Sequence, residues 1–326
     1  MIIVFSNNLD PATLDVTKWL RFYGAPFARI NSDDKDIPTP RIRFENDMAE
    51  IEFESRWISL TDVTAIWYRK GNFWRHEAGQ RVDVPQCNAL SQNINGHLKW
   101  EADVARDYFH YLVKKRGIKV LGNASLGDSN KLIVLDMARD CGLNVPHFHL
   151  TERIHGDFAD NPDSYITKPV SNGMYFWDIH ESSRGYFSYT EQLSDINLRG
   201  RAVPLSLIQK KVKKKFEVRS FYLDGQFLSC AIFSQLDSRT TVDYRKYNYI
   251  RPNRNLPYDM PADIEEKLTE LFHRLDLNTG SVDLIVDEQD QHYFLEINPS
   301  GQYTGISNRC NFGIDLSIAQ WLMGER

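Results

Sequence analysis

The sequence has few cysteines and no long apolar run. Its 326 residues include only four cysteines, and none of them stands in a C-x-x-C pair. This usage excludes a zinc ribbon and a disulfide framework, and it predicts reduced thiols. No apolar stretch approaches the roughly 20 residues that a helix needs to span a bilayer. The opening "MIIVFSNN" also lacks the cleavage pattern of a secretory signal. We therefore expect a cytoplasmic protein without a membrane partner.

The chain also lacks an excess of positive charge. Its formal net charge is −5, whereas general binders of nucleic acid or anionic membranes are normally basic, so we expect no nucleic-acid partner. The hydrophobic content of 42% and the charged content of 25% are those of an ordinary globular protein. Because the length exceeds the roughly 250–300 residues at which a single core stops growing, we expect two or three domains.

The first predicted domain, residues 1–122, has an α/β pattern. The apolar run "IIVF" is followed by Asp10 and Pro11, which suit the N-cap and first position of a helix that Gly24 ends. "FARIN" then predicts a second strand, so the chain opens as β-α-β. The alternating segments "RIRFEN" and "AEIEFE" predict a hairpin, "VTAIWYRK" a further strand, and residues 86–116 a long helix.

The rest of the chain predicts a small central domain, residues 123–205, and a C-terminal domain, residues 206–326. In the central domain Ser129 is expected to cap a helix that Gly142 ends, and "SYITKPV" predicts a strand. In the C-terminal domain Asp224-Gly225 predicts a hairpin turn, and a helix near residues 262–275 precedes a second hairpin, "SVDLIVDEQDQHYFLEIN".

This second hairpin carries carboxylates on one face. A tight turn that pairs Val286 with Tyr293 places Asp283 opposite Glu296, and alternation puts the Phe, Glu and Asn of "FLEIN" on one side. Opposed carboxylates repel unless a cation lies between them. With the amide oxygen of Asn298 they form an incomplete oxygen shell, which suits magnesium that keeps waters and phosphate oxygens as further ligands. The alternative is that Glu296 caps a surface strand and never meets Asp283.

Several cations precede this hairpin. Lys131 follows the cap of its helix. It is either an ordinary exposed lysine, or its ammonium binds an anion that approaches the positive end of the helix. Lys168 lies within an apolar strand, where lysine is uncommon, and this position favours a directed role. "IQKKVKKKFEVRS" holds five lysines in thirteen residues, which predicts either a solvated hairpin face or a nucleic-acid patch; the acidic chain argues against the patch. Glu217 and Arg219 share a strand face there, and an arginine fork suits a triphosphate or an acyl phosphate.

Taken together and in this order, these motifs resemble the ATP-grasp ligase superfamily. They are Lys131 after its cap, "ITKPV", "LIQKKV", "FEVRSF" and "FLEINPSGQ". Within the superfamily the chain resembles the graspetide maturases, which are the microviridin-type and grasp-with-spasm peptide-modifying ligases, through "AIWYRK", "NKLIVLDMARDCGLNVP" and "TTVDYRKY". The chain is also similar to ligases that add glutamate to ribosomal proteins. The resemblance implies an ATP-grasp fold with an N-terminal α/β domain, a small central subdomain and a C-terminal antiparallel-sheet subdomain.

The resemblance also implies ATP and Mg²⁺ as cofactors and gives the candidate residues their roles. The α- and β-phosphates would be held by Lys131 and Lys168, and the ribose by Glu217. The hinge is the segment Gln209, Lys210, Lys211 and Val212, and its backbone would form hydrogen bonds with adenine. Magnesium would be held by Asp283, Glu296 and Asn298. The catalytic residues would be Arg219, which stabilises the transferring phosphoryl group, and Arg245, which engages the acceptor carboxylate.

The implied activity is that of a peptide macrocyclase. ATP would phosphorylate Asp or Glu side chains of a ribosomal precursor peptide, and Ser or Thr hydroxyls, or a Lys amine, would close the ring as ester or lactam. A leader segment would dock the peptide and raise the local concentration of its core. A homodimer is expected from the resemblance. The alternatives are a ligase that adds glutamate to a protein or peptide terminus, and a nucleotide-binding module without catalysis.

Overall fold

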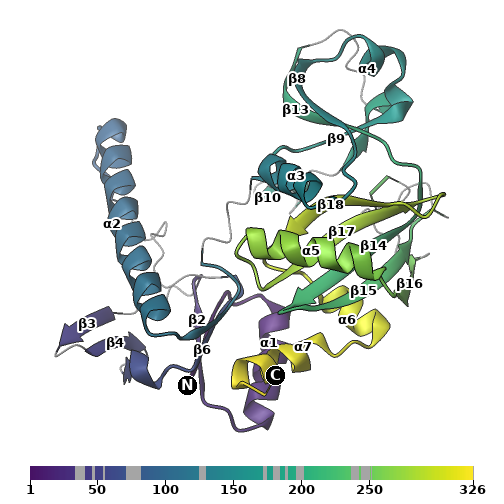
Figure 1. The fold of residues 1–326 in the computed structure, drawn as a ribbon. Coiled ribbons are helices and arrows are strands. Elements are labelled where there is room, and N and C mark those ends of the chain that lie inside the picture. The colour runs from purple at the N-terminus through teal and green to yellow at the C-terminus, as the bar shows by residue number, and fades with distance from the viewer. Residues whose placement is uncertain are drawn as a thin grey trace. The chain divides into compact units, whose positions relative to one another are not determined.

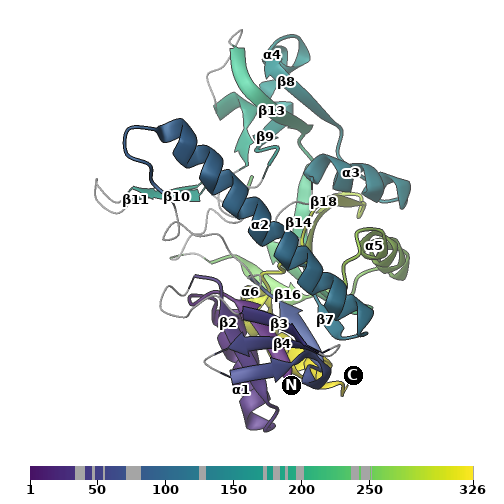
Figure 2. The ribbon, with the colours of Figure 1, turned by 90° about the vertical axis from the view of Figure 1, so that its left-hand side faces the viewer.

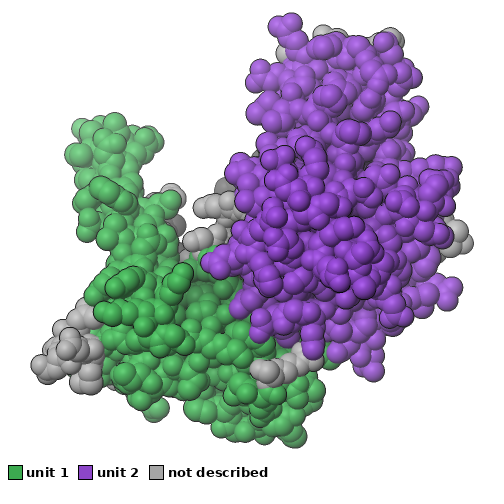
Figure 3. All heavy atoms as spheres, in the orientation of Figure 1, with its two compact units in different colours: residues 1–126, 313–326 green, residues 127–312 purple. Residues whose placement is uncertain are grey.

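A computed structural model describes residues 1–33, 41–45, 48–53, 56–70, 82–124, 130–171, 175–178, 184–187, 190–195, 202–235, 242–243, 250 and 252–325. The chain divides into two compact units, which are residues 1–126 with 313–326, and residues 127–312 (Figure 3). The fold is mixed α/β, as the sequence predicts. The three-domain division with boundaries at residues 122 and 205 stays a prediction.

The first unit is built on a four-stranded parallel sheet in the order β2-β1-β6-β7. Its strands are β1 (Ile2–Ser6), β2 (Phe27–Asn31), β6 (Ala65–Tyr68) and β7 (Lys119–Leu121). Every residue of β1 and β6 is buried, which explains why both strands are continuous apolar runs rather than alternating ones. Helix α1 (Pro11–Phe22) connects β1 to β2, so the predicted β-α-β opening is confirmed.

Other elements complete this unit (Figure 1). The predicted hairpin forms, and a third strand extends it into the antiparallel sheet β3-β4-β5. Its strands are β3 (Arg41–Glu45), β4 (Met48–Phe53) and β5 (Arg56–Ser59). The long predicted helix is α2 (Asn88–Lys115), and α7 (Ile314–Met323) packs on α1, where the Trp19 indole donates to Asp315 at 2.9 Å. Among the described residues no helix is both long and apolar enough to cross a membrane.

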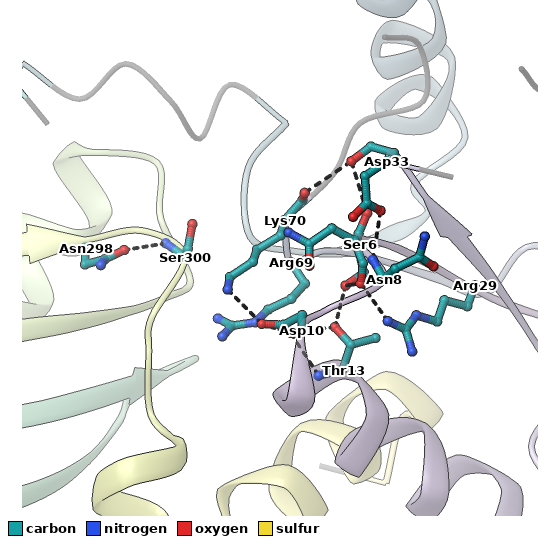
Figure 4. A network of polar contacts seen from close by, with 12 residues as sticks. Ser6, Asn8, Asp10, Thr13, Arg29, Asp33, Arg69, Lys70, Asn298 and Ser300 are labelled. Carbon is teal, nitrogen blue, oxygen red and sulfur yellow. Dashed lines mark hydrogen bonds and ion pairs between the residues drawn. The ribbon is translucent and has the colours of Figure 1, made fainter. Parts of the chain in front are cut away.

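Asp10 caps α1, as predicted, and it also forms ion pairs with the two cationic residues that follow β6 (Figure 4). One carboxylate oxygen accepts from the Thr13 backbone at 2.9 Å, the Thr13 hydroxyl at 2.8 Å and the Arg69 guanidinium at 3.1 Å. The other oxygen lies 2.9 Å from the Lys70 ammonium. Burial alone would raise the pKa of Asp10, but the charge of Arg69 and the bonds from Lys70 and Thr13 outweigh it and hold this pKa well below its ordinary range.

The second unit contains a five-stranded antiparallel sheet in the order β16-β15-β14-β17-β18. Its strands are β14 (Lys214–Leu223), β15 (Gln226–Phe233), β16 (Arg254–Pro257), β17 (Thr279–Asp287) and β18 (His292–Asn298). The Asp224-Gly225 turn joins β14 to β15, and both of its residues have positive φ, as a tight hairpin turn requires.

Helices α3 (Lys131–Asp140) and α5 (Ala262–Arg274) pack their apolar faces on one face of this sheet (Figure 1). Tyr222 of the sheet stacks on Phe272 of α5 with ring centroids 4.1 Å apart. Helix α6 (Thr304–Cys310) follows β18 and contacts β15 and β16. Because α3 and α5 bury one face, the side chains that alternate with the core residues of β14, β17 and β18 point to the opposite face.

A second, smaller sheet in this unit has the order β12-β9-β13-β8. Its strands are β8 (Phe148–Arg153), β9 (Tyr165–Lys168), β12 (Glu191–Gln192) and β13 (Ala202–Lys210), and the short helix α4 (Asp157–Asp160) lies between β8 and β9 in the chain. β10 (Tyr175–Asp178) and β11 (Arg184–Phe187) form a separate hairpin (Figure 2). The small sheet has its own core, which includes Ile154, Leu193, Val203 and Ile208.

Candidate active site

A cavity of about 270 Å³ lies within the second unit, and residues of both of its main sheets line it. The small sheet contributes Ile166, Lys168 and Gln209, and helix α3 contributes Lys131. The five-stranded sheet contributes Glu217, Arg219, Ile232, Asp283, Ile285, Leu295, Glu296 and Asn298. The structure therefore brings together eight of the candidate residues, although they lie up to 167 positions apart in the chain (298 − 131 = 167).

Strand register orders these residues along the sheet. Glu217 pairs with Ile232 on one side and Ile285 on the other, so its row is otherwise apolar. One step along the same face, Arg219 pairs with Asp283, which in turn pairs with Glu296. The cavity wall thus changes from an apolar row with one carboxylate to a charged row. This gradient suits a ligand with a flat, weakly polar end and a strongly charged end.

The predicted pairing of Asp283 with Glu296 is confirmed, but the predicted register at the hairpin tip is wrong. Val286 pairs with His292 rather than with Tyr293. A bulge then inserts Leu295 as an extra residue between the partners of Leu284 and Asp283, and this restores the predicted acidic pair. The bulge also places Phe294 in the core that α3 and α5 cover, so Phe294 does not share a face with Glu296.

Two cationic side chains, Arg219 and Lys131, neutralise the acidic pair. The Arg219 guanidinium donates to both oxygens of Asp283, at 2.9 and 3.1 Å, and to the Gln302 carbonyl at 3.1 and 3.2 Å. The Lys131 ammonium lies 3.6 Å from Glu296. The repulsion expected between facing carboxylates is therefore relieved by neighbouring side chains.

The donor set fits magnesium only if a ligand completes it. Among the described residues no group of three or more His, Cys, Asp or Glu side chains gathers to hold a metal. Three side chains with oxygen donors line the cavity: Asp283, Glu296 and Asn298. The Asn298 amide oxygen also accepts from the Ser300 backbone at 3.1 Å. Magnesium is satisfied by one or two carboxylates when waters and phosphate oxygens supply the rest, so the set fits a metal that arrives with a polyphosphate.

Glu217 is buried, with one oxygen bonded and one oxygen without a partner. The first oxygen accepts from the Lys214 ammonium and from the Ser234 hydroxyl at 3.3 Å. The second is buried and has no hydrogen-bond partner among the described residues, and the same holds for both polar atoms of the Gln209 amide. Burial raises the pKa of Glu217 to about 7; Lys214 opposes this shift, and Asp283 and Asp243 add to it. Buried polar atoms of this kind that line a cavity are suited to hydrogen-bond with a polar ligand.

The hinge residues Gln209–Val212, at the end of β13, are only partly placed at the cavity. Gln209 lines it, whereas Lys210, Lys211 and Val212 are not among the residues that line it. The backbone N–H of Lys210 already donates to the His147 carbonyl at 2.8 Å, and that of Lys211 donates to the Ser164 carbonyl at 2.9 Å. Adenine contacts by this segment, as the resemblance implies, stay a prediction and would have to use its carbonyl groups or Val212.

The predicted N-cap of α3 is wrong by one residue. The cap of α3 is Asn130, whose side chain accepts from Leu132 and Ile133, and not the predicted Ser129, because Lys131 already begins the helix. Arg245 lies outside the described residues, so its role stays a prediction. Asp243, two positions before it, is buried, accepts from the Thr190 backbone at 3.1 Å and lines the cavity.

Sequence reasoning missed two residues of this site. Gln302, after the proline turn that follows β18, holds Arg219 through its carbonyl, and no sequence pattern marks a backbone contact of this kind. Lys214 was one of five similar lysines in a run, and only the structure distinguishes it from the others. Its pairing with Glu217 three positions later needs a bulge at Lys215, where the register of β14 on β17 shifts.

The fold is that of the ATP-grasp ligases, and solved structures of such enzymes match the whole chain. A RiPP-associated ATP-grasp ligase from Chryseobacterium gregarium, in complex with ADP and a leader and core peptide, has a TM-score of 0.77 at 21% identity over 100% of this chain and 97% of that chain. The macrocyclase MdnC from Microcystis aeruginosa MRC, bound with the precursor peptide MdnA, has a TM-score of 0.73 at 21% identity over 100% of both chains. The ATP-grasp ligase PsnB, with minimal precursor, Mg and ADP, has a TM-score of 0.65 at 17% identity over 99% of this chain and 96% of that chain. No protein-family model and no curated protein matches the sequence.

Proposed function

We propose that this chain is an ATP-grasp ligase that closes macrocycles in a ribosomal precursor peptide, with ATP and Mg²⁺ as cofactors. One observation carries the proposal: a single cavity gathers buried, unpartnered polar atoms beside an apolar row and, one step along the sheet, a charged row. That order fits a nucleotide with its base and ribose at Gln209 and Glu217 and its phosphates at the charged row. The solved ligases with this fold that contain ADP and precursor peptides support the choice of substrates.

The candidate residues then have the following roles. Lys131 and Lys168 bind the phosphates as point charges, and Glu217 accepts from the ribose. The metal, held by Asp283, Glu296 and Asn298, would neutralise charge on the phosphate oxygens. Arg219 stabilises the transferring phosphoryl group. Arg245, which lies outside the described residues, would engage the acceptor carboxylate.

The reaction balances in two steps. A side-chain carboxylate oxygen of the peptide attacks the γ-phosphorus, and the bond to the β-phosphate oxygen breaks, so ADP leaves and an acyl phosphate forms. A Ser or Thr hydroxyl oxygen, or a Lys amine, then attacks the acyl carbon; phosphate leaves and the attacking group loses its proton. The peptide loses one water for each ring. The protein contributes by positioning the reactants and neutralising charge, because a free carboxylate has no adequate leaving group.

The partner in this proposal is a precursor peptide whose leader docks on the enzyme while its core reaches the cavity, and the enzyme acts in the cytoplasm as a homodimer. The four free cysteines are compatible with a reducing compartment. Helix α2 offers a surface for a second copy, because Trp100, Val104, Tyr108 and Tyr111 are exposed and recur at about one helical turn. Light scattering on the purified chain tests the dimer, and Trp100→Glu with Val104→Glu is expected to give the monomer.

The activity is tested with peptides that carry repeated Thr or Ser and Asp or Glu near their ends. We expect ADP release that depends on one such peptide and a product mass lower by one water per ring. Asp283→Asn should abolish both, whereas Asp290→Asn, at the hairpin tip outside the cavity, should not. A rise in product mass would instead indicate addition of an amino acid, and ATP binding without ADP release would indicate a non-catalytic module.

A further inference from the structure

One lysine of the run between residues 210 and 215 differs from its neighbours. Lys213 and Lys215 pair with Glu288 at 2.9 Å and Asp290 at 2.6 Å, and their side chains are 83% and 49% exposed. The Lys214 side chain is 6% exposed and contacts Glu217, whose side chain is 8% exposed. Exposed ion pairs contribute little to stability, so the outer lysines keep the strand solvated, whereas a buried cation requires a specific reason.

The bulge at Lys215 explains how the Lys214 side chain reaches Glu217. In a regular strand, residues three apart point to opposite faces, but the extra residue turns Lys214 to the face of Glu217. The Lys214 ammonium also donates to the Val242 carbonyl at 3.3 Å. Val242 and Asp243 line the cavity, so one cation contacts both the buried carboxylate and this part of the cavity wall.

All contacts on Glu217 that the structure describes fall on one of its two oxygens. Lys214 and Ser234 both donate to Oε1, and Oε2 is buried without a partner. A carboxylate anchored at one oxygen cannot rotate freely, and therefore the direction of the second oxygen is fixed. Because Glu217 lines the cavity, a ligand hydroxyl there would meet a pre-aligned acceptor.

We propose that Lys214 is a positioning residue, which anchors Glu217 so that its second oxygen accepts from a ribose hydroxyl of the bound nucleotide. This inference rests on the proposed function, since it takes the ligand to be ATP. Burial disfavours the charged form of Glu217, and the adjacent ammonium favours it. Removing Lys214 would therefore leave a carboxylate that is both misdirected and more readily protonated, and a neutral carboxyl is the weaker acceptor.

The test compares ATP with 2′-deoxy-ATP and 3′-deoxy-ATP by calorimetric titration of the full chain. We expect the wild type to bind ATP at least about 10-fold more tightly than one of the two analogues, as loss of a hydrogen bond to a charged group predicts. Lys214→Met should weaken ATP binding and reduce this preference to about 2-fold or less. Lys214→Arg should restore much of it, because a guanidinium can still donate to Oε1.

The two outer lysines supply matched controls. Lys213→Met and Lys215→Met also remove an ion-paired lysine from the same run, and both should keep the wild-type preference. General loss of structure would weaken all three nucleotides together and leave their ratio unchanged, so the ratio separates positioning from stability.

The possible outcomes are distinguishable. A wild type that does not discriminate between ATP and either analogue, or a Lys214→Met variant that keeps full discrimination, overturns the positioning role while ATP binding itself stands. A wild type that binds no nucleotide overturns the proposed function. Should Lys214→Met fail to fold, Lys214→Gln, which keeps a neutral donor, decides the question: an intermediate preference is expected, and an unchanged one contradicts the inference.

Discussion

Each unit contains a buried carboxylate that pairs with a buried cationic side chain, Arg69 or Lys214, and the two carboxylates differ in how completely they are satisfied. Asp10 in the first unit accepts four contacts, from Thr13, Arg69 and Lys70, spread over both of its oxygens (Figure 4). Glu217 in the second unit has both of its contacts on one oxygen. The pKa of Asp10 lies well below its ordinary range, whereas burial raises that of Glu217 to about 7.

The difference indicates different purposes. A carboxylate that is fully bonded inside the protein stabilises the fold and has no capacity left for a ligand. A carboxylate that is half bonded, buried and part of a cavity wall costs stability unless a ligand supplies the missing contacts. The comparison therefore identifies Asp10 as structural and Glu217 as part of a binding site.

The largest effect is expected from Asp10→Asn. It removes the charge that pairs with Arg69 and Lys70, and the Arg69 side chain is only 4% exposed, so the free energy of unfolding should fall by about 3–5 kcal/mol. Because the pKa of Asp10 is depressed, this contribution is present at neutral pH and is lost only as the pH falls below the ordinary value of 3.8. Denaturant unfolding measures the change.

Asp15→Asn is the matched control for Asp10→Asn. Asp15 also lies in α1 and also pairs with a cation, Lys18 at 3.0 Å, but both side chains are exposed. The cost should stay below about 0.5 kcal/mol. Equal losses in the two variants would contradict the structural role assigned to Asp10.

The next effect has the opposite dependence on pH. Because the pKa of Glu217 is raised, its contribution to stability is fully present below 4.5 and is lost as the pH rises to about 7. The free energy of unfolding of the wild type should therefore fall relative to that of Glu217→Gln between these two values. The difference between 4.5 and about 7 corresponds to about 3 kcal/mol.

Urea unfolding of both proteins at several pH values between 4 and 8 tests this expectation. Lys214, Asp283 and Asp243 are the charged groups that face Glu217, and they are the same in both proteins, so the difference curve isolates Glu217. ATP should flatten the curve, since a bound ribose hydroxyl supplies the missing contact. Parallel stability profiles for the two proteins would show that Glu217 is as well satisfied as Asp10.

A smaller effect concerns the turn that supports the cavity wall after β18. Gly301 has φ +53° and donates to the Asn298 carbonyl at 3.0 Å. A Cβ there would lie 2.9 Å from the Phe221 ring and 3.1 Å from the Gly280 backbone. Gly301→Ala should lower the free energy of unfolding by about 1–3 kcal/mol, from backbone strain and overpacking.

Gly305→Ala controls for Gly301→Ala. Gly305 lies within α6, and a Cβ there meets nothing within 4 Å, so alanine should be neutral or stabilise by up to about 1 kcal/mol. Thermal unfolding of the two variants distinguishes these outcomes. If Gly301→Ala is as stable as Gly305→Ala, the turn is not the close contact that the structure describes.

Much of this comparison could be predicted from the sequence, because strand alternation and cap chemistry are local. The N-cap role of Asp10 and the turn at Asp224-Gly225 both follow from short patterns. The partners of Asp10 do not, since Arg69 lies 59 positions away and is brought back by parallel pairing.

The two bulges were beyond sequence reasoning, because a bulge is a property of how two strands fit and not of one strand. At Leu295 the bulge offset a one-residue error in the predicted turn, so the acidic pair was right while Phe294 was assigned to the wrong face. At Lys215 the bulge turned a neighbouring lysine towards Glu217, and this pairing was not predicted.

The smallest effect is expected from Lys213→Met. The Lys213 ammonium lies 2.9 Å from Glu288, a good ion-pair distance, yet the two side chains are 83% and 50% exposed. Water screens the attraction and ordering two long side chains offsets it, so the free energy of unfolding should change by less than about 0.5 kcal/mol. Lys214, one position along the chain, should show a far larger change on the same substitution. A similar cost at both positions, measured by denaturant unfolding in 0.15 M salt, would mean that burial does not distinguish the lysines of this run.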